Sequence, residues 1–146
     1  MKLIISGGRN RELTFIGLAF LDHLLRTFKI THVYHGGASG IDEMGAMWAE
    51  ARDLNVVAFP ADWDKYGPKA GPMRNQTMAI AATACVLFAG NKGTFSMRSN
   101  AQKHKLKIFD KMADHTMTRL ISSRSHTYRV VEAYLKQHPG THLADA

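Results

Sequence analysis

Hydrophobic residues in this chain gather into short runs that are separated by longer segments of mixed character. The runs are LIIS (3–6), THVYH (31–35), NVVAF (55–59), ACVLF (84–88) and KIFD (107–110). The first four lack the apolar and polar alternation of a half-exposed strand. They therefore predict strands that are buried on both faces of a parallel sheet.

Two of the intervening segments carry apolar side chains at helical spacing. The first, residues 12–28, repeats them at Phe15, Leu18, Leu21, Leu25 and Phe28, and the second at Met44, Met47, Trp48, Ala51 and Leu54. Strands that alternate with helices at this interval predict right-handed crossovers. The expected fold class is therefore α/β, an open and mostly parallel sheet with helices on both faces.

The pattern fades after Asp110. Residues 111–126 have no clear period, whereas TYRVVEAYLKQH (127–138) predicts one amphipathic helix that a Pro-Gly pair ends. We expect residues 1–110 to form the main domain and residues 111–146 a C-terminal helical extension that packs on the domain or on a partner subunit. The apolar face of the predicted helix favours a homodimer or higher homo-oligomer, because it needs a surface to cover; it consists of Tyr128, Val131, Tyr134 and Leu135.

Length and composition are those of a globular protein. With 146 residues, 45% of them hydrophobic and 21% charged, the chain has room for one domain with a real core. No apolar stretch approaches the length that crosses a bilayer, and the start, MKLIISGGRNR, does not resemble a signal peptide. We therefore expect a cytoplasmic protein without a membrane partner.

The net charge and the cysteine and histidine residues indicate which ligands the chain could bind. The formal net charge of +7 favours anionic partners, and nucleotides and nucleic acid both fit it. Cys85 is the only cysteine and lies in an apolar run, so we expect a buried thiol. The eight histidines are scattered, without metal-ligand spacing. The sequence therefore predicts no metal site and no cofactor.

Glycines concentrate in the loops that follow the predicted strands. Eleven of the twelve glycines occur by Gly93, and ligands of open α/β sheets bind at the carboxyl ends of the strands. The first such loop contains Gly7, Gly8 and Arg9. Its glycines allow a tight turn with exposed amides, and the arginine could bind a phosphate or carboxylate. A plain turn with a solvated arginine is the alternative.

The second loop is HGGASGID (35–42), with Gly36, Gly37, Ala38 and Gly40 ahead of a predicted helix. It is neither a Walker loop nor a dinucleotide fingerprint. Amides at the start of a helix nevertheless form a natural anion site. Asp42 could either cap this helix or accept a hydrogen bond from a ribose hydroxyl.

The third segment, PADWDKYGPKAGPMRNQTM (60–78), is longer than a compact connection needs, which is typical of functional loops. Trp63 and Tyr66 could stack on a base or plug the end of the sheet. Pro72 suits the first turn of a helix. Arg74 and Asn75 should then lie in that turn and face the strand ends.

The fourth loop is FAGNKGTFSM (88–97). Gly90 and Gly93 bracket Asn91, and Thr94 should open the next helix, so that its hydroxyl and the neighbouring amides could bind a phosphate. The four loops should meet at one edge of the sheet. Together they predict a pocket for phosphate and ribose.

These loops also resemble a known family. ISGGRN, HGGASGIDEMGAMWA, PADWDKYGPKAGPMRN and the weaker FAGNKGTFSM stand in the order and spacing of the YspA-type, cpYpsA-related branch of the SLOG superfamily. That superfamily includes the LOG phosphoribohydrolases and the DNA-processing Smf/DprA proteins. The resemblance spans roughly residues 1–110 and implies a Rossmann-like fold with a nucleotide ligand. The matched site positions are Gly7, Gly8, Arg9, Gly36, Gly37, Gly40, Asp42, Arg74 and Asn75.

The comparison with the LOG enzymes bears on catalysis. Arg74 resembles their catalytic arginine, but Met97 stands where the resemblance implies their catalytic glutamate, and PGG of their motif is replaced by AGN (89–91). A methionine can neither orient water nor stabilise an oxocarbenium-like state. Asp42, Asp62 or Asp64 could substitute from a neighbouring loop. The sequence thus favours binding over catalysis.

Three functions follow as hypotheses. The first is binding, sensing or sequestration of a nucleotide-derived signal such as an ADP-ribose-type ligand; the resemblance implies a place for it in phage–bacterium conflict. The second is a nucleotide N-glycosidase of the LOG type. The third is single-stranded DNA binding of the DNA-processing type. RSNAQKHKLK (98–107) is the basic candidate for this third function, or else a solvated helix face.

Overall fold

The structure is a computed structural model that describes residues 1–122 and 126–140. Its centre is a five-stranded sheet in the order β4-β3-β1-β5-β6, and every pairing in it is parallel. The strands are β1 (Lys2–Ser6), β3 (His32–His35), β4 (Asn55–Ala58), β5 (Ala84–Phe88) and β6 (Lys107–Lys111). The predicted α/β class with an open parallel sheet is confirmed.

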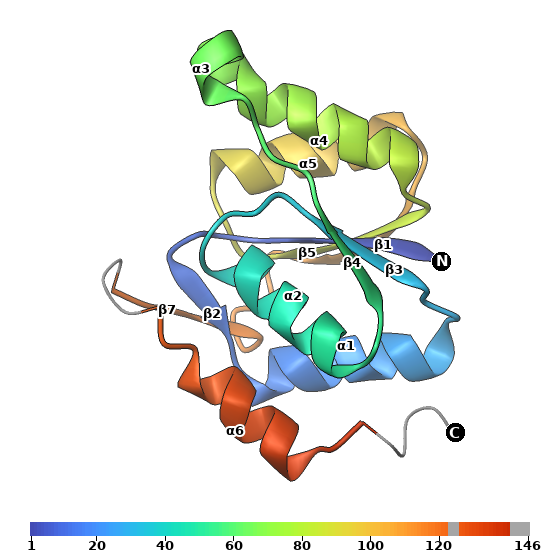
Figure 1. The fold of residues 1–146 in the computed structure, drawn as a ribbon, viewed down its shortest axis with the longest axis vertical. Coiled ribbons are helices and arrows are strands. Elements are labelled where there is room, and N and C mark those ends of the chain that lie inside the picture. The colour runs from blue at the N-terminus through green and yellow to red at the C-terminus, as the bar shows by residue number, and fades with distance from the viewer. Residues whose placement is uncertain (123–125, 141–146) are drawn as a thin grey trace.

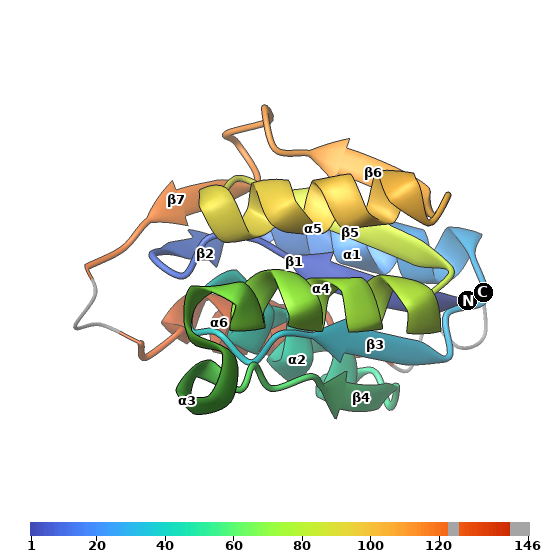
Figure 2. The same cartoon turned by 90° about the horizontal axis from the view of Figure 1, so that it is seen from above.

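Helices cover both faces of this sheet (Figures 1 and 2). One face carries α1 (Phe15–Thr27), α2 (Ile41–Ala51) and α6 (Arg129–Gln137), and the other carries α4 (Ala70–Ala81) and α5 (Lys92–Lys103). Alternate residues of each strand point to opposite faces. Accordingly, Leu3 and Ile5 belong to the core under α1 and α2, whereas Ile4 and Cys85 belong to the core under α4 and α5.

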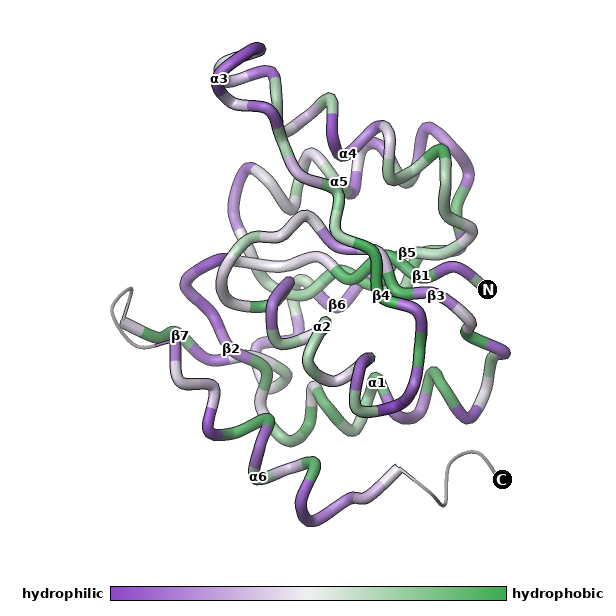
Figure 3. The backbone as a smooth tube through the Cα atoms, viewed as in Figure 1, coloured by the Kyte–Doolittle hydropathy of each residue, from purple (hydrophilic) through white to green (hydrophobic). Residues whose placement is uncertain are grey.

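The edge strand β4 differs from its prediction. NVVAF lacks polar alternation, but Asn55, Val57 and Ala58 are exposed. Its hydropathy matches that of the central strands (Figure 3), yet β4 pairs only with β3. The expectation of burial on both faces is wrong here, because α4 packs toward β1 and α5 and leaves one face of the edge strand uncovered.

Two further elements were not apparent in the sequence. β2 (Arg11–Leu13) and β7 (Thr118–Leu120) form a separate antiparallel pair. As a result, α1 starts at Phe15, the first residue of its apolar repeat, and not at the beginning of the segment 12–28. Thr14 is its N-cap and accepts a hydrogen bond from the Gly17 amide at 3.3 Å. Three-residue strands that pair across the whole chain leave no periodic signal.

The long segment after β4 is also more regular than predicted. It contains α3 (Trp63–Tyr66) and the 3-10 helix η1 (Gly67–Lys69), and α4 already begins at Ala70. Pro72 lies in the first turn of α4 as expected, but Arg74 and Asn75 lie in its second turn.

The C-terminal helix α6 packs against α1 and α2 of the same chain. Tyr128, Val131 and Tyr134 are buried there in the main core. Tyr134 donates a hydrogen bond to Asp22 of α1 at 2.6 Å, and Arg52 makes an ion pair with Asp22 at 2.8 Å. The apolar face of α6 is thus covered within one chain, and homo-oligomerisation stays a prediction. No helix in the described part of the chain is long and apolar enough to span a bilayer.

Candidate functional site

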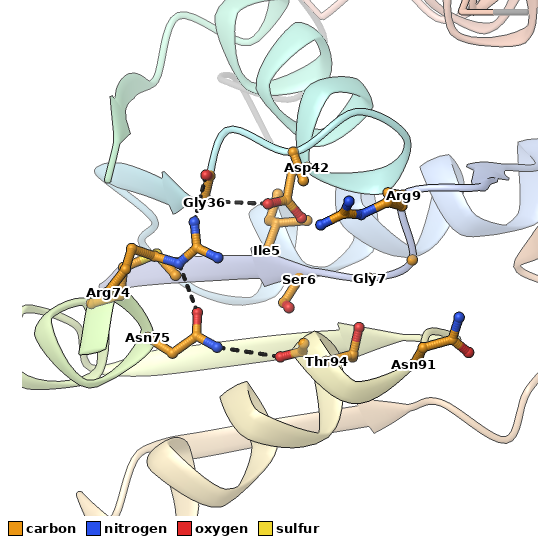
Figure 4. A pocket seen from close by; sticks show the side chains of 14 residues that line it. Ile5, Ser6, Gly7, Arg9, Gly36, Asp42, Arg74, Asn75, Asn91 and Thr94 are labelled. Atoms are coloured by element: carbon orange, nitrogen blue, oxygen red, sulfur yellow. Dashed lines mark hydrogen bonds between the residues drawn. The ribbon is translucent and has the colours of Figure 1, made fainter. Parts of the chain in front are cut away.

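The loops after β1, β3 and β5 meet the start of α4 at the carboxyl edge of the sheet, around a cavity of about 150 Å³ (Figure 4). Binding pockets for drug-sized ligands usually measure about 300–1,000 Å³, so this cavity fits a phosphate and a sugar better than a whole nucleotide. Its lining consists of Ile5, Ser6, Gly7, Gly8, Arg9, Gly36, Ala38, Asp42, Arg74, Asn75, Met78, Asn91, Gly93 and Thr94.

The loop between β3 and α2, residues 36–40, uses its own amides for internal hydrogen bonds. The amide of Gly36 donates to Asp42 Oδ2 at 3.0 Å, and the amide of Gly37 donates to His35 Nδ1 at 3.0 Å. The amide of Ile41 donates to the Gly8 carbonyl at 3.3 Å. These amides have protein partners in place of the anion that the sequence suggested.

Gly40, the N-cap of α2, is bound by a residue from the C-terminal extension. Its amide donates to the hydroxyl of Tyr128 at 2.6 Å, and that hydroxyl donates to Glu43 Oε2 at 2.7 Å. Gly40 has φ +80°, and a Cβ there would lie 2.5 Å from the Gly8 carbonyl oxygen. Only glycine fits this position. The sequence did not reveal that Tyr128 and Glu43 support this loop, because nothing local marks a partner so distant along the chain.

Arg74 and Asn75 of α4 connect the two sides of the cavity. Arg74 donates to the Gly36 carbonyl at 2.6 Å and, through Nε, to Asn75 Oδ1 at 2.9 Å. The amide of Asn75 donates to the Gly93 carbonyl at 3.3 Å and to Ser96 Oγ at 3.1 Å. The other terminal nitrogen of Arg74 points into the cavity (Figure 4). The guanidinium can thus be fixed by the protein and still offer a donor to a ligand.

Among the described residues, Asp42 is the only carboxylate in the lining. Burial raises its pKa to about 6, although the Gly36 amide, the charge of Arg74 and the amides of Ala38 and Gly7 all act in the opposite direction. Asp42 does not cap α2, because Gly40 is the N-cap. Its carboxylate instead lies on the cavity wall (Figure 4), where it could accept hydrogen bonds from hydroxyl groups.

The start of α5 has fewer hydrogen-bonded amides than the loop before α2. Its N-cap, Asn91, makes no side-chain capping bond, and the first amides of a helix have no partner within the helix. A Cβ on Gly93 would meet no atom within 4 Å. Within the described chain, the amides of residues 92–94 donate to no protein acceptor, so they are available to an anion in the cavity.

Arg9 joins the cavity to two neighbouring hollows, and its side chain is exposed. One hollow, of about 190 Å³, extends past residues 36–39 to Trp63. The other continues past Asn91 and Lys92 to Phe95. The central cavity thus opens toward an aromatic side chain at either end.

Comparisons with known proteins identify the family and the fold. The profile of the family described as "YspA, cpYpsA-related SLOG family" matches residues 1–66. The gene 61 protein of Mycobacterium phage D29 is 31% identical over 118 residues, which cover 75% of this chain and 94% of that protein. This chain belongs to the YspA-type, cpYpsA-related SLOG family.

The fold is shared with a solved structure of a SLOG-fold protein. The crystal structure of DNA processing protein A from Streptococcus pneumoniae matches with a TM-score of 0.58 at 15% sequence identity. The match covers 75% of this chain and 49% of the other. The chain therefore spans about half the length of that protein, and the similarity concerns the fold.

Most of the site residues that were predicted from the four loops do come together. Eleven of them line the cavity, and Gly37 and Trp63 line the hollow beside it. Gly40 and Gly90 instead pack on protein atoms, and Asp62 caps α3 by accepting from the Lys65 amide at 3.1 Å. Tyr66 lines none of these spaces; the Lys65 ammonium lies over its ring. The sequence did not indicate Ile5, Ser6 and Met78.

The position of the LOG-type glutamate lies away from the cavity in this SLOG chain. Met97 is fully buried under α4 and α5, in the same core as Cys85. Burial also raises the pKa of the Cys85 thiol to about 12. No cluster of three or more metal-ligating side chains occurs in residues 1–122 and 126–140.

Proposed function

We propose that the chain binds a nucleotide or a nucleotide-derived signal in this cavity. The observation that supports the proposal best is the spatial order of its polar groups. The amides that begin α5 lie on one side of the cavity, Asp42 and Arg74 lie on the other, and the Arg9 side chain is drawn next to Asp42 (Figure 4). Cationic and amide donors suit a phosphate, and a carboxylate suits the hydroxyls of a ribose.

This order gives the ligand a direction. The phosphate binds at the start of α5, away from the repulsion of Asp42, and Arg9 closes over it. The ribose hydroxyls donate to Asp42. The base leaves the central cavity along residues 36–39 and stacks on Trp63, whose side chain is 52% exposed.

Titration calorimetry with AMP and ADP-ribose tests the proposal. Arg9→Ala should lower the affinity about tenfold or more, because it removes a charged donor to the phosphate. Arg9 is exposed, so the variant should fold normally. Arg26→Ala is the matched control, since Arg26 is also exposed but lies in the last turn of α1. Flat titrations of the wild-type protein with both compounds would contradict the proposal.

The phage relative suggests a biological setting. A protein that captures a nucleotide signal would serve either side in a conflict between phage and bacterium. We therefore propose that the chain senses or sequesters such a signal.

A nucleotide N-glycosidase is the second candidate, and Asp42 is the observation that favours it. A buried carboxyl with a pKa of about 6 beside an arginine could assist the departure of a base. The test is the release of free adenine from AMP, measured by chromatography. Asp42→Asn should be inactive. AMP that stays intact with stoichiometric protein would exclude this candidate for AMP.

In the basic segment proposed to bind single-stranded DNA, residues 98–107, some of the cationic side chains already have partners within the protein. Arg98 is paired with Asp110 at 2.6 Å, and the Lys107 ammonium lies over the rings of Phe28 and Phe109. DNA binding would still be recognised by a steep loss of affinity with added salt.

A further inference from the structure

Two exposed aromatic side chains stand out because neither contacts another ring or a cation among the described residues. Trp63 and Phe95 are 52% and 53% exposed. Within the described residues, the other exposed aromatic side chains have such partners: Phe15 packs against Tyr134, and Tyr66 lies under Lys65. Exposed aromatic rings without ring partners are available to stack on a ligand.

These two residues lie at opposite ends of the same site. Trp63 lines the hollow that shares Gly36, Ala38 and Arg74 with the central cavity. Phe95 lines the hollow that shares Asn91 and Gly93 with it. Arg9 lines all three spaces. An aromatic side chain, a phosphate site and a second aromatic side chain therefore follow one another along a continuous surface.

The surroundings of Phe95 suit a second nucleotide unit. Lys92, one turn before it on α5, lines the same hollow as Arg9. On its other side, Phe95 borders a hollow with Arg11, Arg98 and Asp110, in which Arg98 and Asp110 form an ion pair. A base on the ring of Phe95 would thus have Arg9 and Lys92 on one side and Arg11 on the other for its attached phosphates.

We infer that the ligand class of this site is a dinucleotide, with two bases joined through ribose and phosphate. One base stacks on Trp63 and the other on Phe95. Arg9 and the α5 amides bind the phosphate between them. The inference rests on the proposed nucleotide function and narrows it, because a ligand with one base leaves Phe95 unused.

Calorimetry with the linear dinucleotide pApA and with ADP-ribose tests the inference. The two probes have two phosphates and two riboses each, but ADP-ribose has only one base; because a phosphodiester also replaces a pyrophosphate, the Phe95 variants are needed to assign a difference to the second base. Stacking of a base on an aromatic side chain changes affinity by about 5- to 150-fold. We expect pApA to bind at least fivefold more tightly than ADP-ribose.

Variants assign the difference to a residue. Phe95→Ala should lower the affinity for pApA at least fivefold and that for ADP-ribose less than twofold, and Phe95→Trp should keep the affinity for pApA. Trp63→Ala should weaken both probes. Ile80→Ala is the matched control: it removes a side chain that is 66% exposed on α4, outside all three spaces, and should change neither affinity.

The outcomes separate the two proposals. Equal affinities for pApA and ADP-ribose, or no effect of Phe95→Ala on pApA, would overturn the dinucleotide while nucleotide binding stands. Failure of AMP, ADP-ribose and pApA alike to bind would contradict the proposed function itself. If a 20-mer of deoxyadenylate bound far more tightly than pApA with a steep salt dependence, the partner would be nucleic acid and the dinucleotide would be wrong.

Discussion

The starts of α2 and α5 face each other across the cavity, and they use glycine in opposite ways. Before α2, three glycines precede a helix whose neighbouring amides already bind Asp42, His35 and Tyr128. At the start of α5, glycine leaves the amides uncovered. The comparison teaches that a glycine-rich loop next to a site can be a packed wall, while the sparser loop offers the donors.

The largest expected effect comes from Gly40→Ala. The alanine would have to adopt φ +80°, and its Cβ would lie 2.5 Å from the Gly8 carbonyl oxygen. That oxygen belongs to the backbone and cannot move aside cheaply. We expect a loss of about 3 kcal/mol or more in the free energy of unfolding, measured in urea. Gly37→Ala is the matched control, because its φ is +76° but no atom lies within 4 Å. It should cost about 1–2 kcal/mol. Equal losses would show that the loop is not a packed wall.

The pH dependence of stability tests the buried charge of Asp42 on this wall. Its pKa is about 6 in the folded protein and 3.8 in the unfolded chain. Between these values the folded state binds more protons, so the stability falls as pH rises from about 4 to about 6 and is level above that. The full loss is about 3 kcal/mol.

Urea unfolding between pH 4 and 7 measures this loss. Asp42→Asn should remove the decline that is specific to Asp42, although it also weakens the bond to the Gly36 amide at every pH. An identical pH profile for both proteins would show that Asp42 is not responsible.

Tyr128→Phe probes the link between the C-terminal extension and the wall. The variant keeps the ring and leaves the Gly40 amide without its partner. A buried donor without a partner costs about 1–3 kcal/mol. Tyr66→Phe is the control, because Tyr66 is exposed. If both variants had the same midpoint in urea, the hydroxyl of Tyr128 would not support the loop.

Much of this architecture could be predicted, and what could not has a physical reason. The central strands and the loops at their ends follow from local hydrophobic runs and glycine placement. Burial of β4 could not be predicted, since it depends on which neighbours cover a strand. The hydrogen bond from the Gly40 amide to Tyr128 could not be predicted either, because the two residues meet only when α6 packs on α2. Local pattern predicts where a loop lies, whereas the partners of its amides are decided by tertiary packing.

The smallest effect on stability, and the sharpest contrast with Gly40, is expected for Gly93→Ala. Its Cβ has open space and its φ is not positive, so the free energy of unfolding should stay the same or rise by about 0.5–1 kcal/mol. The new methyl would enter the cavity beside the free amides of α5, so the affinity for AMP should fall about tenfold. Ser99→Ala, on an exposed position of the same helix, should change neither quantity. A Gly93→Ala protein that bound AMP as tightly as the wild type would move the phosphate away from the start of α5.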